Sequence, residues 1–197
     1  MPHFLPMPDV DPTSDDGRTL PDYGASITPA SDYGPWTDHE VPADRSAWHP
    51  LVRQLYDYWI DIAPPDRLPG RQHLSPIDIA PLLPRIWMLD VVRMPLRYRY
   101  RLVGTAEVGT LGREVTGRWL DDVHPEFKDD PLLTARYRYI AETGRPTWRR
   151  GPVRWNHDHL HRLVENCLVP LASDGQTVDI ILAISVLFYV DGSLVQV

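Results

Sequence analysis

The stretch from Ile180 to Val190 constrains the fold most, because both faces of a strand built from it would be largely apolar. One face would carry Ile180, Leu182, Ile184, Val186 and Phe188. The other face would carry Ile181, Ala183 and Leu187. A strand of this kind is expected at the centre of a sheet and covered on both sides. The stretch is about half of the roughly 20 residues that cross a bilayer, so we interpret it as a buried strand.

Other segments also have the period of two that predicts strands. Residues 85–91 alternate in this way, and in residues 97–102 three arginines alternate with Tyr98, Tyr100 and Leu102. Met94-Pro95-Leu96 would turn between them, where a proline does not interrupt the ladder. The chain then ends in three predicted strands, at residues 147–155, 160–171 and 178–189.

Apolar spacing and capping residues predict the helices. The stripe that begins with Leu51 and Leu55 predicts a helix from Ala47 to Ile62. The longest helix would start at the N-cap Asp130 and stop at Gly144. Short helical segments are expected between Ser75 and Leu83 and around Val108 and Leu111.

Two strands, short helices, one long helix and three strands predict an α+β fold, a five-stranded antiparallel sheet with helices on one face. Five segments in this order resemble the bacterial stand-alone PAS proteins, in which one PAS domain makes up most of the chain. They are Leu83–Val91, Tyr100–Thr105, Leu111–Arg118, Glu142–Pro146 and Val169–Leu171. The resemblance covers about residues 50–190 and implies a PAS fold with an N-terminal flanking helix.

The chain divides into three predicted parts. Residues 1–46 form an acidic, proline-rich tail that we expect to be disordered, residues 47–83 the flanking helices, and residues 84–192 the PAS core. The tail holds nine acidic and two basic residues, which equals the whole net charge of −7. The remainder is neutral, which gives no support for nucleic-acid binding. The single cysteine and the absence of a signal peptide at the start predict a cytoplasmic protein.

The resemblance implies a sensory or regulatory module. A PAS pocket between sheet and helices can hold a small molecule, haem, flavin or nothing, and PAS domains commonly form dimers. We expect a small-molecule ligand, with the signal leaving through a protein partner or through rearrangement of a homodimer, because no output segment is recognisable in the 197 residues. No membrane partner is expected.

The predicted ligand-binding residues come from both halves of the PAS core. They are Trp87, Leu89, Tyr98, Tyr100, Leu102, Val108, Leu111, Tyr137, Ile140, Leu182 and Ile184. Filling the core is the alternative role of each one. The tyrosines stand out because a buried hydroxyl needs a hydrogen-bond partner, which a ligand can supply.

A second hypothesis is a ligand-free protein–protein interaction module. The helix at residues 47–62 would then dimerise through Leu51, Leu55, Tyr58 and Trp59. Its apolar stripe must cover either its own sheet or a second chain.

Cofactors and metals have weaker support. Cys167 lies in a late strand, away from the place of the reactive cysteine in flavin PAS domains, and His124, the candidate haem ligand, is interpreted as a loop histidine. Alternation would bring His157, His159 and His161 to one face of a strand as a metal site, but a polar hairpin tip explains them as well. We expect no cofactor.

Two further functions are not expected. Arg97, Arg99 and Arg101 share one face of their strand, which we interpret as a solvated or dimer-facing surface with Glu165 and other carboxylates as cross-strand partners. The chain carries no nucleophile elbow, P-loop or zinc-protease motif, so we expect no enzymatic activity.

Overall fold

The computed structural model describes residues 41–42, 44–153, 162–189 and 193–195. Nearly all of the acidic tail predicted for residues 1–46 lies outside the described residues. The described part is built on one antiparallel sheet with the strand order β2-β1-β5-β4-β3. The strands are β1 (Ile86–Val92), β2 (Arg97–Val103), β3 (Thr147–Pro152), β4 (Arg162–Leu171) and β5 (Ile180–Tyr189).

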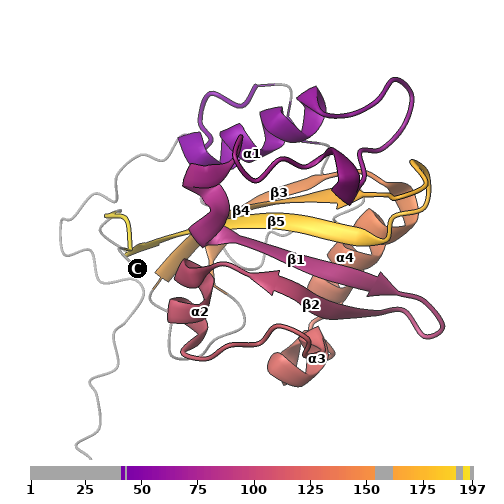
Figure 1. The fold of residues 1–197 in the computed structure, drawn as a ribbon. Coiled ribbons are helices and arrows are strands. Elements are labelled where there is room, and N and C mark those ends of the chain that lie inside the picture. The colour runs from indigo at the N-terminus through magenta and orange to yellow at the C-terminus, as the bar shows by residue number, and fades with distance from the viewer. Residues whose placement is uncertain (1–40, 43, 154–161, 190–192, 196–197) are drawn as a thin grey trace, which may run out of the picture.

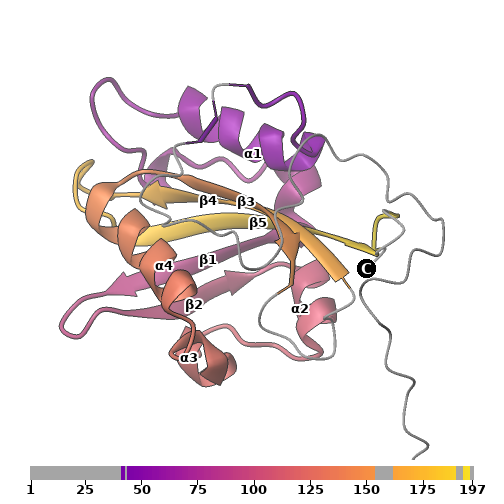
Figure 2. The same cartoon turned by 180° about the vertical axis from the view of Figure 1, so that it is seen from behind.

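Helices lie on both sides of this sheet, with α1 on one side and α4 on the other (Figures 1 and 2). The α-helices are α1 (Pro50–Asp61), α2 (Thr105–Leu111), α3 (Leu120–Val123) and α4 (Pro131–Thr143). The short 3₁₀ helices are η3 (Arg71–His73), η4 (Ala80–Arg85) and η5 (Pro125–Phe127). The predicted fold class is confirmed.

The central strand β5 is covered on both faces, as its sequence predicts. Ile184 and Val186 belong to the core cluster beneath α1, which also contains Leu55. Ile181 and Ala183 belong to the second cluster, beneath α3 and α4. All residues from Ile180 to Phe188 are buried, so the sheet separates two hydrophobic cores.

Local capping explains the longest helix. The Asp130 side chain accepts hydrogen bonds from the backbone N–H groups of Leu132 (3.0 Å) and Leu133 (3.2 Å). Gly144 ends α4 with a φ of 65°, a left-handed conformation that glycine adopts at little cost. Both predicted ends are confirmed.

Two other helical predictions need correction, and one short helix was missed. The first helix begins at Pro50, three residues later than expected, because the His49 ring caps it by accepting from the N–H of Leu51. Residues 75–79 form turns, and the helical segment is η4, which follows them. The short helix α3 lacks a side-chain N-cap and was not predicted.

A buried carboxylate fastens the start of α1 to the sheet. Glu165, on β4, accepts hydrogen bonds from the backbone N–H of His49 (2.7 Å), from Trp148 Nε1 (3.1 Å) and from Arg150 Nε (2.8 Å). The Glu165 side chain has no exposed surface. Its negative charge is therefore held inside by a guanidinium and two N–H donors.

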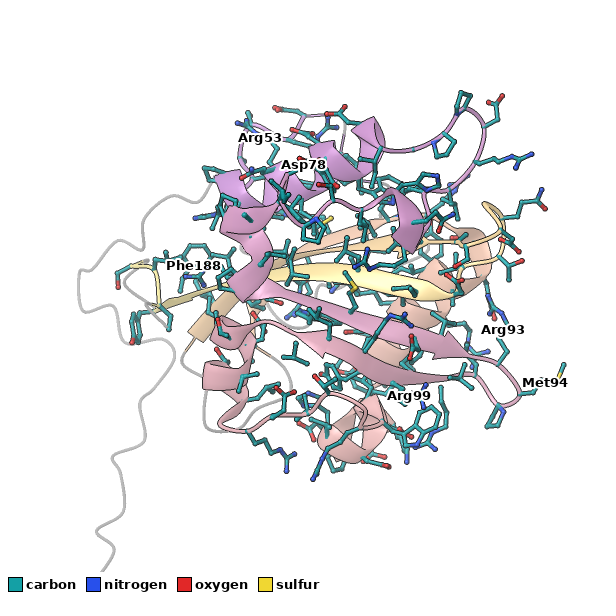
Figure 3. All side chains as sticks on the ribbon, viewed as in Figure 1. Arg53, Asp78, Arg93, Met94, Arg99 and Phe188 are labelled. Atoms are coloured by element: carbon teal, nitrogen blue, oxygen red, sulfur yellow. The ribbon has the colours of Figure 1, made fainter. Side chains whose placement is uncertain are left out.

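The arginine face of β2 is paired within the chain. Arg99 and Arg101 contact Asp90 (3.2 and 2.8 Å), and Arg97 contacts Asp121 (2.7 Å). Arg99 lies on β2, which is one of the two edge strands of the sheet (Figure 3). The expectation that Glu165 would be a partner is wrong, because Glu165 lies on β4 and pairs with Arg150.

In the part of the chain that the structure describes, no helix is both long enough and apolar enough to cross a membrane.

Candidate functional site

A cavity of about 70 Å³ lies between α2 and the face of the sheet that carries the second core. A single water needs roughly 10–15 Å³ of such space, so the cavity has room for several waters or for a small ligand. Its wall includes residues from all five strands and from α2.

A row of polar side chains crosses the sheet side of the cavity. In the strand register, Arg149 on β3 is opposite Asn166 on β4, and Asn166 is opposite Ser185 on β5. Directly paired residues of antiparallel strands share a face, and all three residues are buried and line the cavity. Two positions along the same strands, the neighbouring row is Thr147, Leu168 and Ala183, so the charged and amide groups are confined to the row at the cavity.

Ser185 and Asn166 differ in whether their side-chain oxygen atoms accept a hydrogen bond. The Trp87 indole N–H donates to Ser185 Oγ at 2.9 Å. In contrast, Asn166 Oδ1 is buried and accepts no hydrogen bond from any described residue. A buried polar atom in this state costs about 1–3 kcal/mol, so Asn166 is an acceptor for which the described fold supplies no donor.

An acidic side chain from α2 also faces the cavity. Glu107 lines it together with Thr110 and Leu111 of the same helix. Burial raises the pKa of Glu107 from 4.5 to about 8, and the positive charge of Arg85 opposes this rise. Glu107 is therefore largely protonated and uncharged at neutral pH.

A tyrosine–histidine pair lies at the side of the cavity formed by β2. The Tyr100 hydroxyl oxygen is 3.1 Å from His124 Nε2, and both side chains are buried. Burial lowers the pKa of His124 to about 4 and raises that of Tyr100 well above its usual value. Both groups are neutral at physiological pH. His124 lies in the loop between α3 and η5, as expected, and there it is 6% exposed and lines the cavity.

The rest of the wall is apolar. It consists of Val103, Leu111, Val153, Val164 and Leu187. The cavity therefore joins a polar row on the sheet to apolar ends.

The structure brings some of the predicted ligand residues to this cavity. Trp87, Tyr100 and Leu111 line it. A second group belongs to the core cluster on the same side of the sheet without lining the cavity: Leu89, Tyr98, Tyr137 and Ile140. Val108 is half-buried on α2.

Three predicted ligand residues lie elsewhere. Leu182 and Ile184 lie on the other face of β5, in the core beneath α1. Leu102 is paired with Met88 of that core and is 39% exposed. Most residues on both faces of β5 are apolar, and Ser185 is the polar residue that marks the face at the cavity.

The predicted dimer residues face the chain's own sheet. Leu55 is fully buried beneath α1. Leu51, Tyr58 and Trp59 are half-buried and pack against the same core, and Trp59 Nε1 donates to the carbonyl of Pro170 at 2.8 Å. The apolar stripe of α1 is thus covered largely by its own sheet.

The predicted metal ligands His157, His159 and His161 lie outside the described residues. Within the described ranges, no group of three His, Cys, Asp or Glu side chains is arranged to hold a metal ion. Cys167 is fully buried, and burial raises the pKa of its thiol to about 12, so it stays a protonated, unreactive thiol.

The polar cavity residues Arg149, Asn166, Ser185 and Glu107 were missed by the sequence prediction. A signal was nevertheless present, because Asn166 and Ser185 each stand between apolar residues on one face of a buried strand. Polar residues at such places need a partner.

The protein is therefore an α+β domain with a partly polar cavity between α2 and its five-stranded antiparallel sheet. The sequence model described as "PAS domain" matches residues 47–184. Because the match spans most of the chain, the protein belongs to the PAS domain family.

Comparison with solved structures shows similarity to one described as the structure of an RNA-binding light-oxygen-voltage receptor. The identity is 19% and the TM-score 0.39, and the match covers 62% of this chain and 36% of that chain. A search of curated proteins found no match.

Proposed function

We propose that this PAS domain is a sensory or regulatory module that binds a small molecule in the cavity between α2 and the sheet. The observation that carries the proposal is Asn166, whose Oδ1 is buried at the cavity wall and accepts no hydrogen bond from a described residue. A ligand that donates to this oxygen would remove its desolvation cost.

The surroundings of Asn166 support the same proposal. The polar row beside it includes a guanidinium and a hydroxyl, and Trp87 and Tyr100 add aromatic surface. Ligand sites combine such apolar walls with a few placed polar groups.

The sheet offers a route from the cavity to the opposite surface. Ser185 and Leu187 of β5 line the cavity, whereas the alternating residues Ile184 and Val186 pack beneath α1. A ligand that shifts β5 would therefore change the contacts of α1. We propose that the signal leaves in this way, to a protein partner or through a homodimer.

The other expectations also stay proposals. They are that the protein lacks enzymatic activity, that it does not bind nucleic acid and that it acts in the cytoplasm. A ligand-free interaction module is the alternative function, and a metal site at His157, His159 and His161 is the remote one.

The test compares two cavity variants. Asn166→Leu replaces an amide whose buried Oδ1 accepts no hydrogen bond from a described residue by an apolar side chain, so the variant should be at least as stable as the wild type while losing the ligand. Ser185→Ala removes the acceptor of the Trp87 indole N–H and should instead lower the stability by about 1–3 kcal/mol.

Binding is measured by native mass spectrometry of the freshly purified full chain and by thermal shifts with a small-molecule panel. A bound mass or a thermal shift in the wild type that disappears in Asn166→Leu supports the proposal. A wild type with neither result, or a shift that is equal in Asn166→Leu, contradicts it and favours the interaction module.

A further inference from the structure

We infer that the ligand of this cavity is a small uncharged carboxamide with a short alkyl group, held by Asn166 and Ser185. This inference rests on the proposed function and names the ligand class. Its basis is the pairing of these two residues across β4 and β5. One of them carries an acceptor for which no described residue is the donor, and the other carries a hydroxyl that can donate.

The buried oxygen of Asn166 sets the first requirement, which is a hydrogen-bond donor on the ligand. Asn166 Oδ1 accepts no hydrogen bond from a described residue, so the ligand must bring an N–H or O–H group to this atom. An ionised carboxylate has oxygens that can only accept, and it would leave Asn166 Oδ1 without a partner. Ketones and esters lack a donor in the same way.

The donors beside this oxygen set the second requirement, which is an acceptor on the ligand. Ser185 Oγ accepts from the Trp87 indole N–H at 2.9 Å, so the serine O–H itself can donate. The Asn166 side-chain amide also carries N–H donors. An ammonium ion has donors and no acceptor, so it would leave these groups without a partner.

A carboxamide meets both requirements with one planar group. Its N–H can donate to Asn166 Oδ1 while its carbonyl oxygen accepts from the Asn166 side-chain N–H, so the two amides pair through two parallel hydrogen bonds. Ser185 can donate to the second lone pair of the same carbonyl oxygen. An alcohol has its donor and its lone pairs on one atom, so it cannot face both ends of the Asn166 amide at once.

An uncharged ligand fits the electrostatics of the described wall. Arg149 is buried and has interactions of its own within the protein. Burial raises the pKa of Glu107 to about 8, so its carboxyl group is largely protonated at neutral pH. Burial also keeps Tyr100 and His124 neutral, since it raises the pKa of the first and lowers that of the second. Because burying a charge without a partner is costly, a neutral molecule enters this site more easily than an ion.

The next row of the sheet is apolar and faces the alkyl group. Val164 and Leu187 are paired across β4 and β5, two positions from Asn166 and Ser185, and they line the cavity together with Leu111 of α2. An apolar cavity of about 150 Å³ holds benzene, so a cavity of about 70 Å³ holds roughly three or four heavy atoms. Acetamide is a carboxamide of this size.

The experiment is isothermal titration calorimetry of the full chain at about pH 6.5, where Glu107 is largely protonated. Acetamide is compared with probes of the same size. Acetone and acetate lack its N–H donors, acetamidinium lacks its acceptor, and isopropanol carries donor and acceptor on one oxygen. We expect acetamide to bind at least about tenfold more tightly than each of these, because each leaves a buried polar group without a partner. Urea should also bind more weakly, because it brings an amino group to the apolar end.

Variants assign the binding to the cavity. Asn166→Asp replaces the N–H donors of the side chain by an oxygen with little change of shape, and it should weaken acetamide binding at least about tenfold. The control Gln176→Glu makes the same chemical change at an exposed position between β4 and β5 and should bind like the wild type. If Asn166→Asp does not fold, Asn166→Leu removes the whole amide group and should abolish the binding of acetamide.

Acetone, acetate, acetamidinium or isopropanol that binds as tightly as acetamide would overturn the carboxamide inference while a small-molecule site remains. Urea that binds as tightly would overturn the alkyl group of the ligand. Acetamide binding that Asn166→Asp or Asn166→Leu leaves unchanged would overturn the assignment to Asn166. If no probe binds, the inference fails. The proposed function then fails too only if the purified protein carries no bound mass and the wider panel produces no thermal shift.

Discussion

Replacing Glu107 by Gln should make the protein more stable at alkaline pH and leave its stability nearly unchanged at pH 5. The pKa of Glu107 rises from 4.5 to about 8 because folding buries the carboxyl group. The folded chain therefore binds this proton more tightly than the unfolded chain does. The stability that this proton contributes is complete below pH 4.5 and is lost as the pH rises through 8.

The size of the effect follows from the shift. One pKa unit corresponds to about 1.4 kcal/mol, so the shift from 4.5 to about 8 corresponds to at most about 5 kcal/mol above pH 8. At pH 7 the loss is about 3 kcal/mol. A glutamine has nearly the shape of the protonated glutamate and cannot ionise, so Glu107→Gln avoids this loss.

Urea unfolding of both proteins at pH 5, 7 and 9 measures the difference directly. The variant should exceed the wild type by under about 1 kcal/mol at pH 5, by about 3 at pH 7 and by up to about 5 at pH 9. Glu142→Gln, at an exposed position on α4, is the control and should keep the wild-type profile. Parallel stability curves for Glu107→Gln and the wild type would refute the reasoning.

Three other substitutions test the packing around the site. Leu55→Glu places a charge at a fully buried position and should give unfolded or insoluble protein, as measured by circular dichroism and gel filtration. The control Ile60→Glu, at a position that is 44% exposed, should fold. A folded Leu55→Glu monomer would show instead that α1 is a dimer face. Gly104→Ala adds a Cβ that overlaps the backbone of Leu83 and Pro84 and should cost about 1–3 kcal/mol in denaturant unfolding; an unchanged midpoint would contradict this contact. Glu165→Gln removes the negative charge facing Arg150 and should cost about 3–5 kcal/mol, measured in the same way; a loss below 1 kcal/mol would show that the buried pair does not hold α1.

Most secondary structure could be predicted because its causes are local. Asp130 and Gly144 cap α4 through contacts within a few residues, and the alternation in β2 is visible in six consecutive residues. The short helix α3 lacks such a signal, since no side chain caps its start.

The cavity could be predicted only in part because its polar row joins residues from three strands. Arg149, Asn166 and Ser185 become neighbours through the register of β3, β4 and β5, which no local pattern states. The prediction that Leu182 and Ile184 contact the ligand was wrong for a related reason. The two faces of β5 are alike apart from Ser185, and the position of α1 shows which face the flanking helix covers.

The most direct test of ligand binding in this cavity is the indole N–H signal of Trp87 in a ¹H–¹⁵N correlation spectrum. The Trp87 indole donates to Ser185 at the cavity, whereas those of Trp59 and Trp148 donate to Pro170 and Glu165. Trp87→Phe assigns the signal, and the small-molecule panel is then titrated. We predict that a binding compound shifts the Trp87 signal more than those of Trp59 and Trp148. A Trp87 signal that no compound moves, or binding that moves only the other two, would contradict a ligand site between α2 and the sheet.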